Sequence, residues 1–279
     1  MENSLYLNAL ENLKYKKQRI KDGKLNCIPF PLGEFNRDLP GIEKEQIVLI
    51  TANAKVGKTQ ISDYLYLYTP LEYSLKNPDK CKVKIFYFTL EMSKQKKMQQ
   101  FMCYLLFKKS KGNIHIDIKS INSVFEDTPV DDEILEMLET PEYLEYAKHF
   151  EKCVTFYDNV RNPTGIYMRV KEYMEDHGTW TKKTERWQKE DKTYTTREIK
   201  DQYIPEDPEV YTIVLLDHLA LMDTEANQKD IREAMIQFSS KYALPLRDKY
   251  RCCVVEIQQQ AAALGNVKYI LYLCKIIIY

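Results

Sequence analysis

QIVLITANAKVGKTQ, residues 46–60, carries more information about the fold than any other part of the chain. Its apolar run, IVLI, predicts a buried strand of a parallel sheet. A short loop ending in Gly57, Lys58 and Thr59 follows, and apolar residues then recur at helical spacing. A strand, a loop and a helix in this order are the context that a phosphate-binding loop requires.

Each part of this loop has an expected role in holding a nucleotide. Backbone N–H groups of the loop and of the helix N-terminus would point at the phosphates, where the helix dipole favours an anion. The Lys58 ammonium would reach the β- and γ-phosphates of ATP, and the Thr59 hydroxyl would bind Mg²⁺. The residues expected to line the nucleotide are Ala52, Asn53, Ala54, Lys55, Val56, Gly57, Lys58, Thr59 and Gln60.

One position departs from the pattern G-x-x-x-x-G-K-[ST]. Ala52 stands where the pattern has its first glycine. Alanine tolerates a positive φ less well than glycine does, but a methyl group need not block the turn. The alternative is a chance GKT sequence after a strand, and the fit of both flanking segments favours the nucleotide site.

Composition limits the classes of protein to which the chain can belong. Hydrophobic residues make up 44% of its 279 residues, which is enough for a large α/β domain and too many for a disordered chain. Lys and Arg together number 41, as do Asp and Glu, so no overall positive field attracts nucleic acid. Any binding of nucleic acid must come from a local patch or from assembled subunits.

The cysteines and the N-terminus indicate the compartment. The seven cysteines form no CxxC pair and no zinc-like spacing with histidine, and several lie in apolar runs. Free thiols in such places behave as small hydrophobic groups and indicate a reducing, cytoplasmic environment. The N-terminus has no signal-peptide pattern, and no stretch of about 18 apolar residues predicts a membrane span. We therefore expect no membrane partner.

Further apolar runs predict the other strands of the same sheet. They lie at residues 83–93, 153–157, 210–216 and 251–257. Helical spacing predicts helices at residues 94–109, 164–176 and about 227–243. In the last of these, Ile231, Met235 and Phe238 are expected to face inward. The alternation predicts an α/β fold, a mostly parallel sheet with helices on both faces.

Polar residues end three of these strands, at the edge where α/β sheets bind their ligands. Glu91 ends one apolar run, and Asp217 follows the strongest run, VYTIVLL. A single carboxylate delivered in this way can hold Mg²⁺ opposite the hydroxyl of the loop threonine. Gln258, Gln259 and Gln260 end the last run, where a glutamine could contact the γ-phosphate or could serve as a buried hydrogen-bonding group.

Two segments lie outside this alternation. Residues 2–22 have the spacing of a short amphipathic helix that ends near Gly23. This helix could cap the core of its own domain or dock on a neighbouring subunit, and the sequence favours neither. Residues 110–150 are helical and acidic, and the simplest interpretation is a solvated helical pair that covers the sheet.

Residues 179–209 change in character and predict an inserted loop or a charged hairpin. Trp180 and Trp187 could stack on the bases of a single strand of nucleic acid, as in proteins that bind such strands. They could instead anchor a solvated insertion to the domain. Acidic residues interleaved with the lysines favour the anchoring role.

Four segments in this order resemble one family. FNRDLPGIEKEQIVLITANAKVGKT, FYFTLEMS, IVLLDHLALM and VVEIQQQ, within residues 24–260, are similar to the C-terminal ATPase domain of DnaB-type replicative helicases. The resemblance implies a RecA-like P-loop NTPase fold and an ATP-driven motor for DNA replication that forms a hexameric ring of identical subunits on single-stranded DNA. It also implies a phage-encoded protein that works in the cytoplasm of its host.

The resemblance assigns roles to single residues. Lys58 binds phosphate, Glu91 is the catalytic carboxylate that polarises the attacking water, and Asp217 is the Walker B aspartate. Gln258 or Gln259 couples the nucleotide state to DNA. Geometry supports Glu91, because a general base must reach a water in line with the γ-phosphate and we expect the second strand to end beside the loop. The alternative is an acid that complements the dipole of the next helix.

The C-terminal end departs from the family pattern. Residues 261–279, which end in VKYILYLCKIIIY, match nothing in the family. We expect a shortened end that exposes a sheet edge and lacks the basic finger that completes a neighbour's site, and therefore weak ATP turnover that DNA does not stimulate. The expected division is an N-terminal arm, residues 1–23, and a RecA-like ATPase domain, residues 24–279.

Two other classes of function remain open. One is a RecA-like recombination or annealing protein that forms filaments on DNA, against which the LEMS segment argues. The other is a non-catalytic, DNA-associated subunit that binds ATP only as a switch. Replacing Glu91 by glutamine distinguishes this subunit from a motor, because only a motor depends on hydrolysis.

Overall fold

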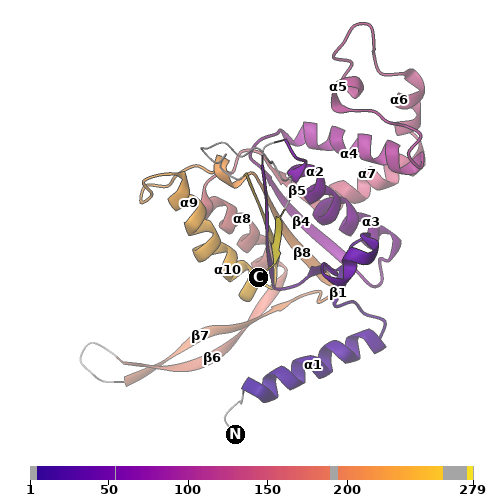
Figure 1. Ribbon diagram of the computed structural model, residues 1–279. Helices are drawn as coiled ribbons and strands as arrows, with labels where there is room; N and C mark the ends of the chain where they lie inside the picture. The colour runs from indigo at the N-terminus through magenta and orange to yellow at the C-terminus, as the bar shows by residue number, and fades with distance from the viewer. Residues whose placement is uncertain (1–4, 54, 189–193, 260–274, 279) are drawn as a thin grey trace.

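A six-stranded sheet forms the centre of the molecule. The computed structural model describes residues 5–53, 55–188, 194–259 and 275–278, and Figure 1 shows their arrangement. The strand order is β10-β3-β9-β8-β4-β5. The strands are β3 (Gln46–Ala52), β4 (Lys82–Thr89), β5 (Val154–Tyr157), β8 (Val210–Asp217), β9 (Cys253–Gln259) and β10 (Lys275–Ile278). Five of them run parallel, and β10 joins β3 antiparallel.

Both faces of the sheet are buried, which explains why its strands are continuous apolar runs. Successive residues of a strand point to opposite faces. Ile213 and Leu215 of β8 pack on one face, called here the α2 face, and Val214 and Leu216 pack on the other, the α8 face. The predicted fold class, a mostly parallel α/β sheet with helices on both faces, is therefore confirmed.

Helices from different parts of the chain cover each face (Figure 1). The α2 face packs against α2 (Lys58–Asp63), η2 (Tyr64–Tyr68), α3 (Thr69–Lys76), α4 (Lys94–Lys109) and α7 (Pro141–Cys153). The α8 face packs against α8 (Pro163–Asp176), α9 (Ile231–Gln237), η4 (Phe238–Ala243) and α10 (Leu244–Asp248). The remaining helical elements are α1 (Leu5–Lys21), η1 (Gly33–Arg37), α5 (Ile118–Ile121), α6 (Asp132–Leu138) and η3 (Leu219–Leu221).

Two of these elements, η2 and η4, are π-helical turns, and each is followed directly by a helix with a proline in its first turn. Pro70 is the second residue of α3, and Pro245 is the second residue of α10. A proline inside a helix lacks the N–H donor and clashes with the carbonyl four residues earlier. A wider π turn moves that carbonyl away. The two prolines therefore account for the interruptions in both helices.

Two of the predicted helical regions differ from the structure. The helix expected at residues 227–243 begins at Ile231, which is 45% exposed rather than inward, whereas Phe238 is fully buried. Residues 110–150 form α5, α6 and α7 instead of a helical pair. Of these three, α7 packs against β4 and β5, whereas α5 packs on α4 and α6 packs on α7. This acidic region therefore contains three helices where the sequence predicted a pair, and one of them, α7, covers the sheet.

The N-terminal helix α1 does not cap the core. None of its residues is buried, so that alternative is wrong. It is tied to the domain near its end, where Arg19 bonds Glu209 at 2.8 Å and the Leu25 carbonyl at 2.7 Å. The chain then forms the short pair β1 (Cys27–Pro29) and β2 (Gly41–Glu43). Gly41 is required there, because a Cβ would lie 1.9 Å from the Ile28 carbonyl oxygen.

Residues 179–209 contain the predicted charged hairpin. It is built from β6 (Gly178–Gln188) and β7 (Tyr194–Pro205), and it projects away from the sheet in Figure 1. Trp180 packs edge-on against Tyr203 and Tyr250, so its anchoring role is confirmed. Trp187 is 48% exposed and lies under the Arg197 guanidinium, so the anchoring role is wrong for this residue.

The C-terminal residues that the structure describes add an edge strand to the sheet, beside β3. β10 pairs along β3 from Lys275↔Thr51 to Ile278↔Val48, so the exposed edge expected there is wrong for β3. The rest of the predicted tail, residues 261–274 and 279, lies outside the described residues. Within the described ranges, no helix has the length and apolar character needed to cross a membrane.

Candidate nucleotide-binding site

The carboxyl ends of four parallel strands meet at one edge of the sheet, and the expected site residues lie along it. In strand order these are β3, β9, β8 and β4. Ala52 at the end of β3 pairs with Gln259 of β9, and Asp217 at the end of β8 pairs with Thr89 of β4. Glu91 follows Thr89 by two residues. The register therefore brings loop, glutamine and both carboxylates to the same edge, as the sequence predicts.

The strand order corrects one expectation. The strand that leads to Glu91 does not end beside the loop, because β9 and β8 lie between β3 and β4. Apolar runs show where strands are but not which strands pair, since pairing depends on contacts between distant segments. The first turn of α2 reaches toward β8 instead, and the Thr59 hydroxyl donates to Asp217 Oδ1 at 3.3 Å.

The loop conformation explains why the chain tolerates Ala52. This residue is the last of β3 and does not have a positive φ. Among the described loop residues, the left-handed positions are Lys55, with φ 61°, and Gly57, with φ 87°. A Cβ on Gly57 would meet only the Gln60 side chain at 3.7 Å, so the backbone angle rather than space favours glycine. Ala54, also expected to line the nucleotide, lies outside the described residues.

Lys58 is the first residue of α2 and is almost buried, with 8% of its surface exposed. Its ammonium donates to the Asn53 carbonyl at 3.0 Å, so the side chain bends back over the loop from which it starts. A lysine held in this way is pre-placed over the loop. A phosphate oxygen could replace the carbonyl as its acceptor with little rearrangement.

Thr59 and Asp217 fit a magnesium ion. A hydroxyl and a carboxylate are the hard oxygen donors that Mg²⁺ prefers, and Asp217 is 1% exposed. In the described parts of the chain, no group of three or more His, Cys, Asp or Glu side chains could hold a metal ion by itself. Magnesium at this edge therefore needs phosphate and water oxygens to complete its coordination, as is usual in nucleotide sites.

Glu91 lies in the turn between β4 and α4, and its side chain is exposed. The turn is fixed by Thr89, whose hydroxyl donates to the Met92 carbonyl at 2.6 Å. The Leu90 N–H donates to the Asp217 carbonyl at 2.6 Å, which ties this turn to β8. Ser93, not Glu91, caps α4 by accepting from the Lys96 N–H at 3.4 Å. Ser93 is therefore the N-cap residue of α4, and Glu91 lies two residues before it.

Strand alternation separates two of the three glutamines. Ile257 packs on the α2 face, so Gln259 points to that face and Gln258 points to the α8 face. Asp217 shares the α2 face with Ile213 and Leu215 by the same alternation. Gln259 is therefore the glutamine on the side of the nucleotide loop. Gln260 lies outside the described residues.

A buried charged cluster that was not predicted from the sequence adjoins this site. The Lys97 ammonium lies 2.9 Å from Asp63 Oδ2, 2.6 Å from the Tyr87 hydroxyl and 3.3 Å from Asp217 Oδ2. The Tyr87 hydroxyl lies 2.7 Å from Asp63 Oδ1 and 3.2 Å from Asp217 Oδ2. All four side chains belong to residues that are at most 3% exposed. Burial raises the pKa of Asp63, and its bonds to Lys97 and Tyr87 oppose that shift.

One signal could have identified Lys97. It lies in the run KQKKMQQF, where its lysine and glutamine neighbours before it are exposed. Lys97, Phe101 and Leu105 follow one another at four-residue spacing, and all three are buried in α4. A lysine in phase with an apolar stripe indicates a buried charge. That charge needs partners from other elements, which no local pattern reveals.

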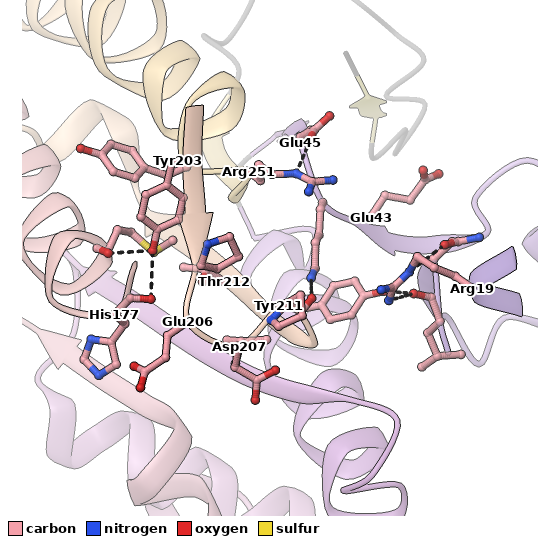
Figure 2. A pocket seen from close by; sticks show the side chains of 18 of the residues that line it. Arg19, Glu43, Glu45, His177, Tyr203, Glu206, Asp207, Tyr211, Thr212 and Arg251 are labelled. Atoms are coloured by element: carbon pink, nitrogen blue, oxygen red, sulfur yellow. Dashed lines mark hydrogen bonds and ion pairs between the residues drawn. The ribbon is translucent and has the colours of Figure 1, made fainter. Parts of the chain in front are cut away.

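A cavity bordered by the described residues lies at the opposite edge of the sheet. It has a volume of about 140 Å³. Its lining comes from α1, the base of the hairpin, the start of β8 and the segments that precede β3 and β9. Figure 2 shows that charged side chains converge there. Arg19 pairs with Glu209, Arg251 pairs with Glu45, and Lys44 donates to the Pro208 carbonyl. Burial lowers the pKa of Lys44 to about 8.

Comparisons with known proteins agree with the fold. No family model and no curated protein sequence matches the chain. A solved structure described as "The Structure Of A DnaB-Like Replicative Helicase And Its Interactions With Primase" is similar, with a TM-score of 0.59 and 15% sequence identity. The similarity covers 96% of this chain and 52% of that one, so this chain spans about half its length. At this identity, the likeness shows a DnaB-like, RecA-like α/β fold.

Proposed function

We propose that the chain is a P-loop ATPase that acts as a replicative DNA helicase subunit on single-stranded DNA. The observation that carries the proposal is the meeting of Thr59 with Asp217 at 3.3 Å. These residues come from the loop helix and from a strand two places away in the sheet. A hydroxyl and a carboxylate converging beside a phosphate-binding loop are the arrangement that a magnesium nucleotide requires.

The residues divide the work of hydrolysis among them. Loop N–H groups and Lys58 would hold the triphosphate, with Lys58 exchanging the Asn53 carbonyl for phosphate oxygens. Thr59 and Asp217 would hold Mg²⁺, which neutralises charge on the β- and γ-phosphate oxygens when bound. Glu91 would orient the attacking water and accept its proton as the bond between the β- and γ-phosphates breaks, giving ADP and inorganic phosphate.

Gln259 and α1 would link this chemistry to DNA and to other subunits. Gln259 lies on the loop side of β9, where it could sense the γ-phosphate. In α1, Leu5, Leu7 and Leu13 are between 52% and 86% exposed, which supports docking of the arm, residues 1–23, on a neighbouring ATPase domain. We propose a ring of identical subunits in the host cytoplasm. A basic residue from a neighbour would accelerate hydrolysis about 10³–10⁵-fold, and without the basic finger that this sequence lacks we expect weak turnover that DNA does not stimulate.

Hydrolysis and binding by a Glu91→Gln variant test the proposal. The wild-type chain should hydrolyse ATP, whereas Glu91→Gln should retain ATP on a filter and lose at least about a hundredfold in rate, because general-base catalysis contributes that much. Glu126→Gln, at another exposed glutamate, is the matched control and should behave as wild type. Equal rates for wild type and Glu91→Gln would refute the assigned role of Glu91.

The same samples distinguish the alternative functions. Rates measured with and without single-stranded DNA show whether the chain responds to DNA. A Glu91→Gln variant that keeps every DNA-linked property would favour a non-catalytic, ATP-switched subunit. Helical filaments on DNA in electron micrographs would favour a RecA-like recombination or annealing protein.

A further inference from the structure

Lys97 is a buried cation at the junction of four elements. It projects from α4 and contacts Asp63 of α2, Tyr87 of β4 and Asp217 of β8. An ammonium has three N–H donors, and these three acceptors can use all of them. A buried ion pair is often no more stabilising than apolar residues of the same volume. Stability alone therefore gives little reason for a lysine at this position.

The two oxygens of Asp217 are used differently. Oδ2 faces the Lys97 ammonium at 3.3 Å and the Tyr87 hydroxyl at 3.2 Å. Oδ1 accepts from the Thr59 hydroxyl at 3.3 Å. The carboxylate is thus held in one orientation, with one oxygen toward the buried cluster and one toward the threonine. Rotation of the carboxylate would break contacts on both sides.

The cluster also has more acidic than basic side chains. It contains one ammonium and two carboxylates, all buried. A buried acid without a charged partner is costly, so the second carboxyl group of the cluster favours a cation beside it. The Asp217 oxygen that does not face Lys97 is Oδ1, next to the Thr59 hydroxyl. A divalent ion held there would supply the missing charge.

We propose that Lys97, supported by Asp63, is a positioning residue that directs Asp217 Oδ1 toward a divalent metal ion and so sets the affinity for that ion. This inference rests on the proposed function, since the ion is the one that accompanies the nucleotide. Lys97 itself touches neither metal nor nucleotide. It acts through the carboxylate, as partners of metal ligands commonly do.

The double variant Asp63→Asn/Lys97→Met isolates orientation from charge. It removes one charge of each sign, so the cluster keeps the same net charge, and the introduced asparagine has the size of the aspartate that it replaces. Mn²⁺ is titrated by electron paramagnetic resonance in the presence and absence of a slowly hydrolysed ATP analogue. We expect the double variant to bind Mn²⁺ about 10–100-fold more weakly. Affinity for the analogue in EDTA should stay unchanged.

Two further variants keep the test decisive. Lys96→Met, at an exposed lysine on the same helix, is the matched control and should leave Mn²⁺ binding unchanged. Tyr87→Phe removes the hydroxyl that lies 2.6 Å from Lys97 without changing any charge. It should weaken Mn²⁺ binding severalfold, and it serves as the test if the double variant fails to fold. Equal Mn²⁺ affinity in wild type and Tyr87→Phe would then overturn the proposal.

The outcomes separate this inference from the proposed function. Binding of the analogue by wild type, with the same Mn²⁺ affinity in the double variant, would overturn the role of Lys97 and leave the nucleotide site standing. Failure of wild type to bind the analogue would refute the nucleotide site. In that event, Mn²⁺ binding is compared in the absence of nucleotide. Weaker binding by the double variant than by wild type would still support the positioning role of Lys97, and equal binding would overturn that role.

Discussion

Two carboxylates on neighbouring strands are buried in opposite ways. Asp217 ends β8 on the α2 face. Glu256, on the neighbouring strand β9, pairs with Leu216, the residue before Asp217. Both oxygens of Asp217 have partners, including a lysine and a threonine. Glu256 has one partner, the Ser239 hydroxyl at 2.8 Å from Oε2, and its Oε1 has none within the described part of the chain. Burial raises the pKa of Glu256 to about 7.

The difference shows two ways of burying an acid. At the proposed nucleotide site, the acid lies against a cation, since the Lys97 ammonium is 3.3 Å from Asp217 Oδ2. On the α8 face, away from that site, the acid can be neutralised by binding a proton instead. The buried lysine therefore distinguishes Asp217 from Glu256, whose carboxyl group has a serine hydroxyl as its partner within the described residues.

Removing only Lys97 should have the largest effect. Lys97→Met leaves Asp63 and Asp217 buried without their cation, and the free energy of unfolding should fall by about 3–5 kcal/mol. Urea denaturation followed by circular dichroism measures this loss. Asp63→Asn/Lys97→Met should recover most of it, and Lys96→Met should match wild type. A loss below about 1 kcal/mol would mean that the cluster is not an interdependent charge network.

Glu256→Gln should reveal the opposite behaviour. The ordinary pKa of this carboxyl is 4.5 and its folded value is about 7, so the unfolded state releases the proton first. The contribution of this group to stability is then fully present below pH 4.5 and is lost as the pH rises through 7, by about 3 kcal/mol in total. Glutamine removes this dependence and should be the more stable form at pH 8. Parallel stability–pH curves for wild type and Glu256→Gln would contradict the account.

The two tryptophans of the hairpin sharpen the contrast within the α8 face. Trp180 packs against the cluster on this face, whereas Trp187 lies near the exposed end of β6. Trp180→Ala should lower the free energy of unfolding by about 2 kcal/mol, less than for a fully buried tryptophan. Trp187→Ala should change it by under about 0.5 kcal/mol. Equal losses would show that the hairpin packs along its whole length.

Local patterns predicted the elements and much of the site. The loop with Lys58 and Thr59 and the strand that ends at Asp217 depend on residues close in sequence, and all were found from the sequence. Strand order and the Lys97 cluster depend on contacts between segments far apart. Asp63 and Asp217, both partners of Lys97, are 154 residues apart in the chain, so no periodicity joins them. Gln259 could be distinguished from Gln258 only after β9 was placed in the sheet, because the pleat of the strand decides to which face each side chain points.

Equilibrium binding of magnesium ATP, measured by titration calorimetry on wild type, Lys58→Ala and Asp217→Asn, tests the central claim most directly. Wild type should bind one ATP per chain. Lys58→Ala should bind ATP at least about tenfold more weakly, because a charge-assisted hydrogen bond is lost. Asp217→Asn should lose the dependence of ATP binding on magnesium. Failure of wild type to bind ATP, or equal affinity in Lys58→Ala, would contradict the claim that these strand ends form a nucleotide site.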